Sequence, residues 1–163
     1  MHNFDDSLPE GEKEESKLDC FFAKWYEIKP VGMNKQRDGI DREWKCRKTK
    51  REFSVEYKAD SKAAETGNVF IETVSVDTTG KPGWAYTSKA QLLVYFIPPD
   101  STAYITPMTT IKTLLPDWID AYREVSVPNG DGVTVKYNTK GLLVPLGDFK
   151  RQCEPKIVRV HCD

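Results

Sequence analysis

Phe53-Ser54-Val55-Glu56-Tyr57-Lys58 is the most informative stretch of this sequence. Its aromatic and β-branched residues are typical of a β-strand. Side chains alternate across a strand, so Glu56 and Lys58 share one face and the apolar residues share the other. The stretch therefore predicts a strand that is apolar on one side and carries an acid beside a lysine on the opposite side.

Asp41 precedes this strand and completes a set of groups that can hydrolyse phosphodiesters. Two carboxylates hold a divalent cation, and a lysine beside them orients or activates the attacking water. Mg²⁺ takes oxygen ligands and keeps several waters, so two or three carboxylates suffice. Plain structural explanations remain open, because Glu56 and Lys58 can form an exposed ion pair and Asp41 can cap a turn after Gly39.

A first helix is expected from residue 8 to about Tyr26. Ser7 is a suitable N-cap, and Glu10 follows three residues later, as in a capping box. The apolar stripe of this helix has helical spacing and consists of Leu18, Phe21, Phe22 and Trp25. Glu15 lies at the edge of the buried face, which is unfavourable for a carboxylate that lacks a partner or a metal ion.

The rest of the chain alternates short strands with helices. Leu92 to Ile97 is fully apolar and is typical of a central, covered strand. Other strands are expected at 39–44, 53–58, 68–76, 104–106, 133–137 and 141–144, and helices at 107–125 and 145–149, with a short helix starting at 87–90. A length of 163 residues suits one α/β domain with its own core.

Composition limits the cellular setting. Hydrophobic residues make up 39% of the chain and charged residues 30%, as in a soluble globular protein. The longest apolar run is far too short to span a bilayer, and the acidic N-terminus has no apolar core of a secretory signal. The four cysteines are scattered without a CxxC pair, which argues against a zinc site or a disulfide framework and favours a reducing cytoplasm; they are Cys20, Cys46, Cys153 and Cys162.

Basic residues gather between Asp41 and Glu56, although the net charge of the chain is only −1. A local basic patch attracts phosphate even on a nearly neutral protein. The patch consists of Arg42, Lys45, Arg47, Lys48, Lys50 and Arg51. A solvated hairpin tip would have the same composition, so the position of the patch is the reason to expect nucleic acid there.

Three short motifs together resemble the helix–strand–strand core of the PD-(D/E)xK nuclease superfamily: Gly11 followed by Glu15, Gly39-Ile40-Asp41, and Val55-Glu56-Tyr57-Lys58. The resemblance implies a restriction-endonuclease-like α/β fold, a mixed β-sheet core flanked by helices, with the acids and the lysine meeting at a notch between two strands. It implies Asp41 and Glu56 as ligands of Mg²⁺, or of Mn²⁺ as a substitute. Glu15 would contribute to the metal directly or through water, and Lys58 would lie next to the nucleophilic water.

The stretches 65–72 and 81–90 resemble small phage and bacterial proteins of the same superfamily. The resemblance covers roughly residues 8–106, so residues 107–163 are expected to elaborate the C-terminal part of a single domain, 1–163. It implies that Thr66 and Asn68 contact phosphate. Gln91 and Tyr95 resemble a Gln-x-x-x-Tyr element that lies near the DNA strand end, although related phage proteins commonly have an acid where Gln91 stands.

The expected function is a metal-dependent deoxyribonuclease, phage-encoded or phage-derived, that acts in DNA processing, recombination or degradation in the cytoplasm of the host. DNA is the expected partner, Arg42, Lys45, Arg47 and Lys48 are candidate contacts to it, no membrane is involved, and a homodimer is an open assembly state. One alternative is a catalytically inactive nucleic-acid-binding or accessory domain that keeps the nuclease fold. A second is an unrelated α/β interaction protein in which the motifs coincide by chance.

Overall fold

The computed structural model describes residues 8–130 and 132–162. Ser7, the predicted N-cap, lies outside the described residues, so its capping role stays a prediction. The first helix, α1, runs from Leu8 to Phe22. It ends earlier than expected, because Tyr26 already belongs to a strand.

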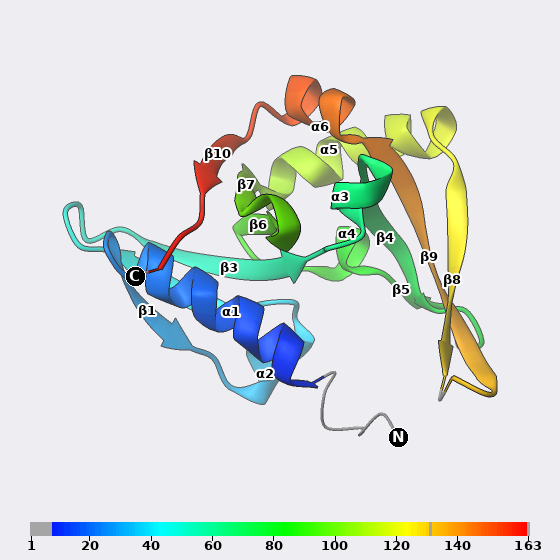
Figure 1. The fold of residues 1–163 in the computed structure, drawn as a ribbon, viewed down its shortest axis with the longest axis horizontal. Helices are drawn as coiled ribbons and strands as arrows, with labels where there is room; N and C mark the ends of the chain where they lie inside the picture. The colour runs from blue at the N-terminus through cyan, green and yellow to red at the C-terminus, as the bar shows by residue number, and fades with distance from the viewer. Residues whose placement is uncertain (1–7, 131, 163) are drawn as a thin grey trace.

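A mixed six-stranded sheet forms the larger half of the fold (Figure 1). Its spatial order is β1-β2-β3-β6-β7-β10. β3 and β6 run parallel, and all other neighbours are antiparallel. The strands are β1 (Tyr26–Pro30), β2 (Arg42–Cys46), β3 (Glu52–Ala59), β6 (Leu92–Ile97), β7 (Thr102–Pro107) and β10 (Lys156–Arg159). The expected central, covered place of β6 is confirmed, since its last five residues are buried.

A four-stranded antiparallel sheet follows in the order β5-β4-β9-β8. Its strands are β5 (Lys81–Pro82), β4 (Asn68–Val76), β9 (Val135–Pro145) and β8 (Glu124–Gly130). The β8–β9 hairpin extends away from the six-stranded sheet (Figure 1). The mixed α/β class expected from the sequence is therefore confirmed.

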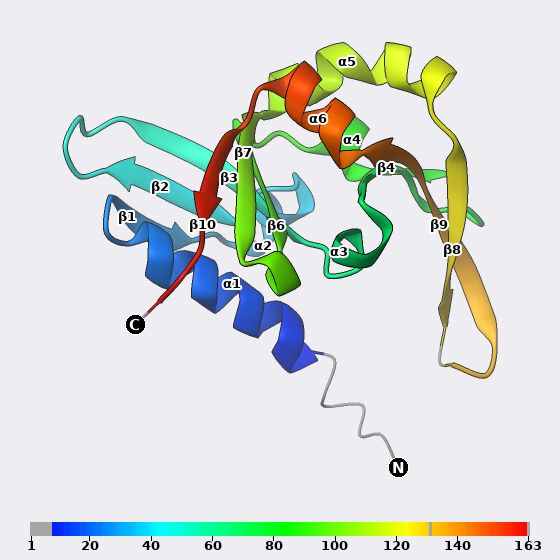
Figure 2. The ribbon, with the colours of Figure 1, turned by 45° about the horizontal axis from the view of Figure 1, so that its top comes forward.

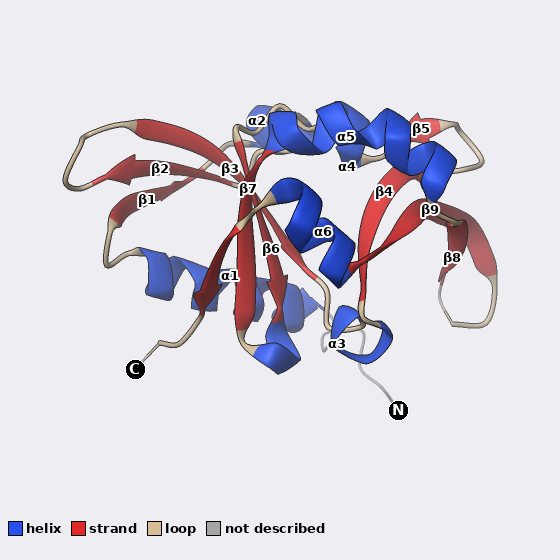
Figure 3. Cartoon of the chain, turned by 90° about the horizontal axis from the view of Figure 1, so that it is seen from above, coloured by secondary structure: helices blue, strands red, loops and turns tan. Residues whose placement is uncertain are grey.

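Helices lie on both faces of the six-stranded sheet (Figures 2 and 3). α1 covers one face, where Leu18, Phe21 and Phe22 pack among buried residues of the strands. The opposite face belongs to a second core, shared with the four-stranded sheet, α4 (Trp84–Thr87), α5 (Met108–Ala121) and α6 (Leu146–Cys153). Two short helices, α2 (Met33–Arg37) and α3 (Ala63–Thr66), and a 3-10 turn, η1 (Pro98–Asp100), complete the described elements. None of the described helices has the length and apolar character needed to cross a bilayer.

Several boundaries differ from those expected. α4 ends where a helix was expected to begin, and α5 ends at Ala121, which leaves the following residues to β8. The two strands expected at 133–137 and 141–144 are one strand, β9. Pro116 lies inside α5 without ending it. These differences share a cause, because tertiary pairing overrides the local signals of glycine, proline and apolar spacing.

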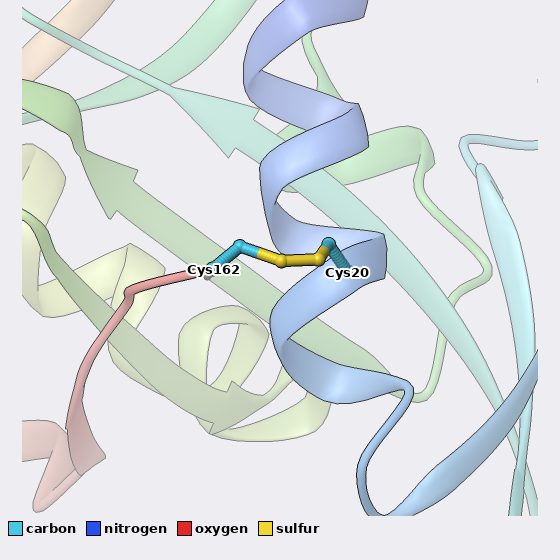
Figure 4. Close-up of a disulfide and its surroundings, with 2 residues drawn as sticks. All are labelled: Cys20 and Cys162. Atoms are coloured by element: carbon cyan, nitrogen blue, oxygen red, sulfur yellow. A yellow bond between two sulfur atoms is a disulfide. The ribbon is translucent and has the colours of Figure 1, made fainter.

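A disulfide between Cys20 and Cys162 joins α1 to the segment after β10 (Figure 4). The two Cα atoms are 6.0 Å apart, within the usual range for a bridge. This pairing corrects the expectation of four unpaired cysteines, and Cys46 and Cys153 are the free ones. The partners are separated by 142 residues, so spacing along the chain gave no signal. Disulfides are rare in reducing compartments, so the cytoplasmic setting stays a prediction.

Candidate functional site

Asp41 and Glu56 lie opposite each other at the end of the β2–β3 ladder that is remote from the connecting turn. The ladder between these strands pairs Arg42 with Val55. Just beyond that pair, the Asp41 backbone N–H donates to the Val55 carbonyl at 2.8 Å, and the Tyr57 N–H donates to Asp41 Oδ2 at 2.8 Å. The carboxylate of Asp41 thus replaces the next backbone acceptor of the ladder. Because Glu56 lies between Val55 and Tyr57, this arrangement sets Asp41 against it.

Glu56 is a buried acid, with 3% of its surface exposed. Its Oε1 lies 3.0 Å from Lys58 Nζ, whereas its Oε2 is buried and has no hydrogen-bond partner. Burial raises the pKa of Glu56 above its ordinary value, Lys58 and the hydroxyl of Ser88 oppose the increase, and the charge of Asp41 adds to it. A buried carboxylate oxygen without a partner is costly, so this atom needs an additional positive group or a proton.

Lys58 connects this acid to open solvent. About a third of its side chain is exposed, and its Nζ lies 5.9 Å from the centre of the Trp84 ring. The expected alternation along β3 is confirmed: Val55 and Tyr57 pack in the core beneath α1, and Lys58 lines a cleft on the opposite side. The lysine is therefore both ion-paired and accessible to a ligand.

Glu15 approaches the site from α1 but is held by Arg42. The Arg42 Nη2 atom lies 3.3 Å from Glu15 Oε2, and its Nε atom lies 3.1 Å from Asp19 Oδ1. Burial raises the pKa of Glu15, and Asp41 contributes to the increase while Arg42 opposes it. Arg42 is half-buried and its guanidinium lies 5.3 Å from the Tyr57 ring centre. This arginine ties α1 to β2 and β3, and its expected contact with DNA stays a prediction.

The negative charge of Asp41 contributes to the raised pKa of both Glu15 and Glu56. Residues 8–130 and 132–162 contain no group of three or more histidine, cysteine, aspartate or glutamate side chains arranged as a metal site. Glu15 is turned to Arg42, which leaves Asp41 and Glu56 as a pair of oxygen donors. Such a pair fits Mg²⁺, which is often held by one or two carboxylates and completes its shell with water and phosphate. The unpartnered Oε2 of Glu56 is the atom that a cation would satisfy.

The wall above Glu56 depends on a glycine. Gly39 has a positive φ of 74°, and a Cβ added there would lie 2.9 Å from the Cα and Oγ of Ser88. The buried Ser88 hydroxyl donates to the Gly39 carbonyl at 2.9 Å. Only glycine combines this backbone conformation with so close an approach. Gly39 and Ser88 therefore fix the segment that leads into Asp41.

A cleft of about 690 Å³ lies between the end of β3, α3 and the four-stranded sheet. Lys58 and Trp84 line it at the end nearest to Glu56. Thr66 and Asn68, expected to contact phosphate, are also in its lining, and the Thr66 hydroxyl accepts a hydrogen bond from the Asn68 N–H at 3.2 Å. The cleft is thus substrate-sized, and Lys58 is the candidate catalytic residue that lines it.

Tyr95 lines the same cleft but is almost fully buried. Its hydroxyl donates to Asp60 and accepts a hydrogen bond from the Phe70 N–H at 3.0 Å. Burial, reinforced by Asp60, raises the pKa of Tyr95 well above its ordinary value. The second oxygen of Asp60 accepts from the Ala63 N–H at 3.2 Å, at the start of α3. Tyr95 therefore positions the cleft wall in this structure.

Gln91 and Lys45 line a separate, shallower cavity of about 360 Å³ on β1, β2 and β3. The Gln91 side chain accepts a hydrogen bond from the Ser54 N–H at 2.9 Å, at the start of the parallel β3–β6 pairing. Arg47 and Lys48 lie in the exposed turn between β2 and β3. That turn is more than four residues from Glu56 along β3, or at least about 13 Å at the usual rise of a strand.

Sequence reasoning missed several residues of the cleft, namely Asp60, Lys62, Trp84 and Arg123. Lys62 directly precedes α3, and Arg123 directly precedes β8. The sequence pattern predicted neither of these elements. Of these residues, Trp84 was the one with a signal in the sequence, because it follows the turn glycine Gly83. In the structure it is 7% exposed. Comparisons of the chain with protein-family models, with curated proteins and with solved structures found no match.

Proposed function

We propose that this protein is a Mg²⁺-dependent deoxyribonuclease of the PD-(D/E)xK type. The observation that carries the proposal is the placement of Asp41 next to Glu56 at the end of the β2–β3 ladder, where Glu56 Oε1 lies 3.0 Å from Lys58 Nζ. Glu56 is the only one of these groups with a buried oxygen that lacks a protein partner. A cation between the two carboxylates would remove that deficit.

Each residue has a distinct part in the proposed reaction. Asp41 and Glu56 would hold the metal ion, which would supply a water of lowered pKa and neutralise charge on the phosphoryl oxygens. Lys58 holds a positive charge at the mouth of the cleft, where it stabilises negative charge that develops as the phosphodiester is attacked. Arg42 holds Glu15 at 3.3 Å on the α1 side of the sheet, so the metal would be held by Asp41 and Glu56.

The architecture supports the same assignment. The antiparallel β2–β3 pair and the parallel β3–β6 pair belong to one mixed sheet. α1 covers one face of this sheet, and other helices cover the opposite face. The superfamily resemblance implies this order of elements and places its acids where the first two strands separate. Asp41 stands at that separation, directly before β2.

A second candidate is a nucleic-acid-binding domain that keeps the fold without cleaving. Two contacts favour it: Lys58 is paired with Glu56, and Glu15 is paired with Arg42. Both contacts neutralise groups that a nuclease would direct to its substrate. Binding of DNA without metal-dependent cleavage would support this candidate.

The test is cleavage of end-labelled linear duplex, closed circular duplex and single-stranded DNA, with Mg²⁺ or with EDTA. We expect metal-dependent cleavage that falls at least about 100-fold in Asp41→Asn and in Lys58→Ala, since each removes charge stabilisation. Glu27→Gln, at an exposed position on β1, is the matched control and should cleave like the wild type. Cleavage that persists in EDTA, or in Asp41→Asn, would contradict the proposal.

A further inference from the structure

We infer that the 690 Å³ cleft binds an unpaired stretch of the DNA substrate next to the cleavage site. This inference rests on the proposed nuclease function and adds to it the form of DNA that enters. It assigns strand binding to Lys62 and Arg123 and to the open face of the four-stranded sheet. None of these was expected from the sequence to touch DNA.

The cleft is continuous with the candidate catalytic residues. Lys58 belongs both to the ion pair with Glu56 and to the lining of the cleft. Trp84, whose ring lies 5.9 Å from Lys58 Nζ, also lines it. A DNA strand with a phosphate at Lys58 would therefore continue into the cleft.

The floor of the cleft suits nucleobases. In the four-stranded sheet Phe70 pairs with Leu143, and Glu72 pairs with Gly141, which in turn pairs with Val125. These residues share one face of the sheet, because side chains alternate along each strand. Apolar and aromatic groups on this face provide stacking surface, which binds single strands without regard to sequence.

Two cations in the cleft are free of ion pairs with the described residues. Lys62 and Arg123 are exposed in its lining and form no ion pair among the described residues. The two acids of the lining are already engaged: Asp60 accepts from the Tyr95 hydroxyl and from Ala63 N–H, and Glu72 Oε1 accepts from the Trp84 N–H at 3.3 Å. The unpaired cations complement the phosphates of a polyanion.

The dimensions favour one strand over two. Pockets of about 300–1,000 Å³ enclose drug-sized ligands, and a nucleotide or two is a ligand of this size. In a B-form duplex the bases are stacked inside, and only grooves about 12 Å and 6 Å wide present their edges. A duplex would therefore touch the rim of the cleft, whereas an unpaired strand can place its bases on the floor.

The test is binding, measured by fluorescence anisotropy in EDTA, of a labelled oligothymidylate and of a duplex of equal length. We expect the single strand to bind at least about 10-fold more tightly than the duplex, the scale of one stacked base. Lys62→Ala combined with Arg123→Ala should lower the slope of log K against log salt by about 0.7 for each lost phosphate contact. Lys17→Ala combined with Arg151→Ala removes the same charge from exposed positions on α1 and α6 and should leave the slope unchanged.

The results separate this inference from the proposed function. Equal binding of duplex and single strand, absence of binding, or an equal loss in the control pair would overturn the strand site, whatever the cleavage assay shows. Asp41→Asn should keep single-strand binding in EDTA within about 2-fold, because Asp41 is not in the cleft lining. Binding with no cleavage of any DNA would keep the strand site and reject the nuclease.

Discussion

Glu56 combines three properties that ordinary ion-paired glutamates lack: it is buried, it faces a second carboxylate, and one of its oxygens has no partner. Its ion-pair partner, Lys58, is itself partly exposed to solvent. An ordinary surface ion pair, by contrast, is exposed and contributes little to the free energy of unfolding. The geometry at this residue therefore favours a site over a structural contact.

The contribution of Glu56 and Glu15 to the stability of the metal-free protein should fall as pH rises from about 4. The folded pKa of each is raised, so the folded state holds its proton more tightly than the unfolded chain does. The resulting stabilisation is complete below the unfolded pKa, about 4.3 for glutamate, and is lost as pH rises through the folded pKa. Thermal melting in EDTA should show Glu56→Gln melting several degrees above the wild type at pH 7, with the two converging near pH 4.

Glu12→Gln, at an exposed position on α1, is the control for this series and should follow the wild-type curve. Added Mg²⁺ should raise the wild-type melting temperature at pH 7 and leave Glu56→Gln almost unchanged, since ligand binding stabilises only the folded state that binds it. A difference in melting temperature between Glu56→Gln and the wild type that does not widen from pH 4 to pH 7 in EDTA would contradict the prediction.

Tyr95→Phe should destabilise the protein by about 1–3 kcal/mol, because the lost hydroxyl leaves one oxygen of Asp60 and the Phe70 N–H without a partner. Urea denaturation at pH 7 measures the change. Tyr86→Phe, half-exposed on α4, should shift the free energy of unfolding by less than about 0.5 kcal/mol. Unchanged stability together with weaker DNA binding would instead give Tyr95 the direct contact that the sequence resemblance implied.

At this scale the sequence was informative where a property depends on local alternation. The faces of Val55, Glu56, Tyr57 and Lys58 follow from strand geometry alone and agree with the structure. The partner of Glu15 did not follow, because Arg42 is 27 positions away. Spacing can place a side chain on a face, but it cannot say which distant side chain meets it there.

At the scale of elements, the strands with strong apolar patterns were found and those set by pairing were not. β6 and β4 are recognisable from composition, whereas β1 was not predicted, because the expected first helix ran to its first residue, Tyr26, where Trp25 continues the apolar spacing. β9 was divided in two, because the polar residues 138–140 separate its two ends, the second of which begins at Gly141. That glycine is required by packing, since a Cβ there would lie 2.5 Å from the Phe70 ring.

Gly141→Ala should therefore destabilise the protein by about 1–3 kcal/mol, the usual effect of overpacking. Gly147→Ala is the matched control: it lies in α6, a Cβ there meets nothing within 4 Å, and it should stabilise by a few tenths to about 1 kcal/mol. Urea denaturation of both variants provides the comparison. Equal stability of Gly141→Ala and the wild type would show that Phe70 moves without consequence.

At the scale of the whole molecule, residues 107–163 are part of the packing around the candidate site. The core on the Glu56 side of the sheet combines Leu93 and Tyr95 with Leu142, Val144 and Phe149, all of them buried. β9 pairs with β4, and β10 pairs with β7. The resemblance that ends near residue 106 therefore marks the extent of recognisable motifs and not the edge of a self-contained core.

A fragment of residues 1–106 should fail to fold on its own. Without the later strands and helices, Val69, Ile71, Leu93 and Ile97 lose much of their cover, although all are fully buried in the intact chain. Exposure of this many core side chains exceeds the marginal stability of a domain this size. We expect an insoluble fragment or one without a cooperative melting transition; a sharp melt with native-like circular dichroism would contradict this.

The link between Cys20 and Cys162 makes almost the whole polypeptide a covalent ring. A single peptide bond cut anywhere between residues 21 and 161 would open this ring without releasing a piece. Nicked protein should therefore keep one mass on a non-reducing gel and separate into two bands after reduction, whereas Cys20→Ser should give two bands in both. The bridge thus turns a linear chain, vulnerable to its first break, into one that stays whole until its second.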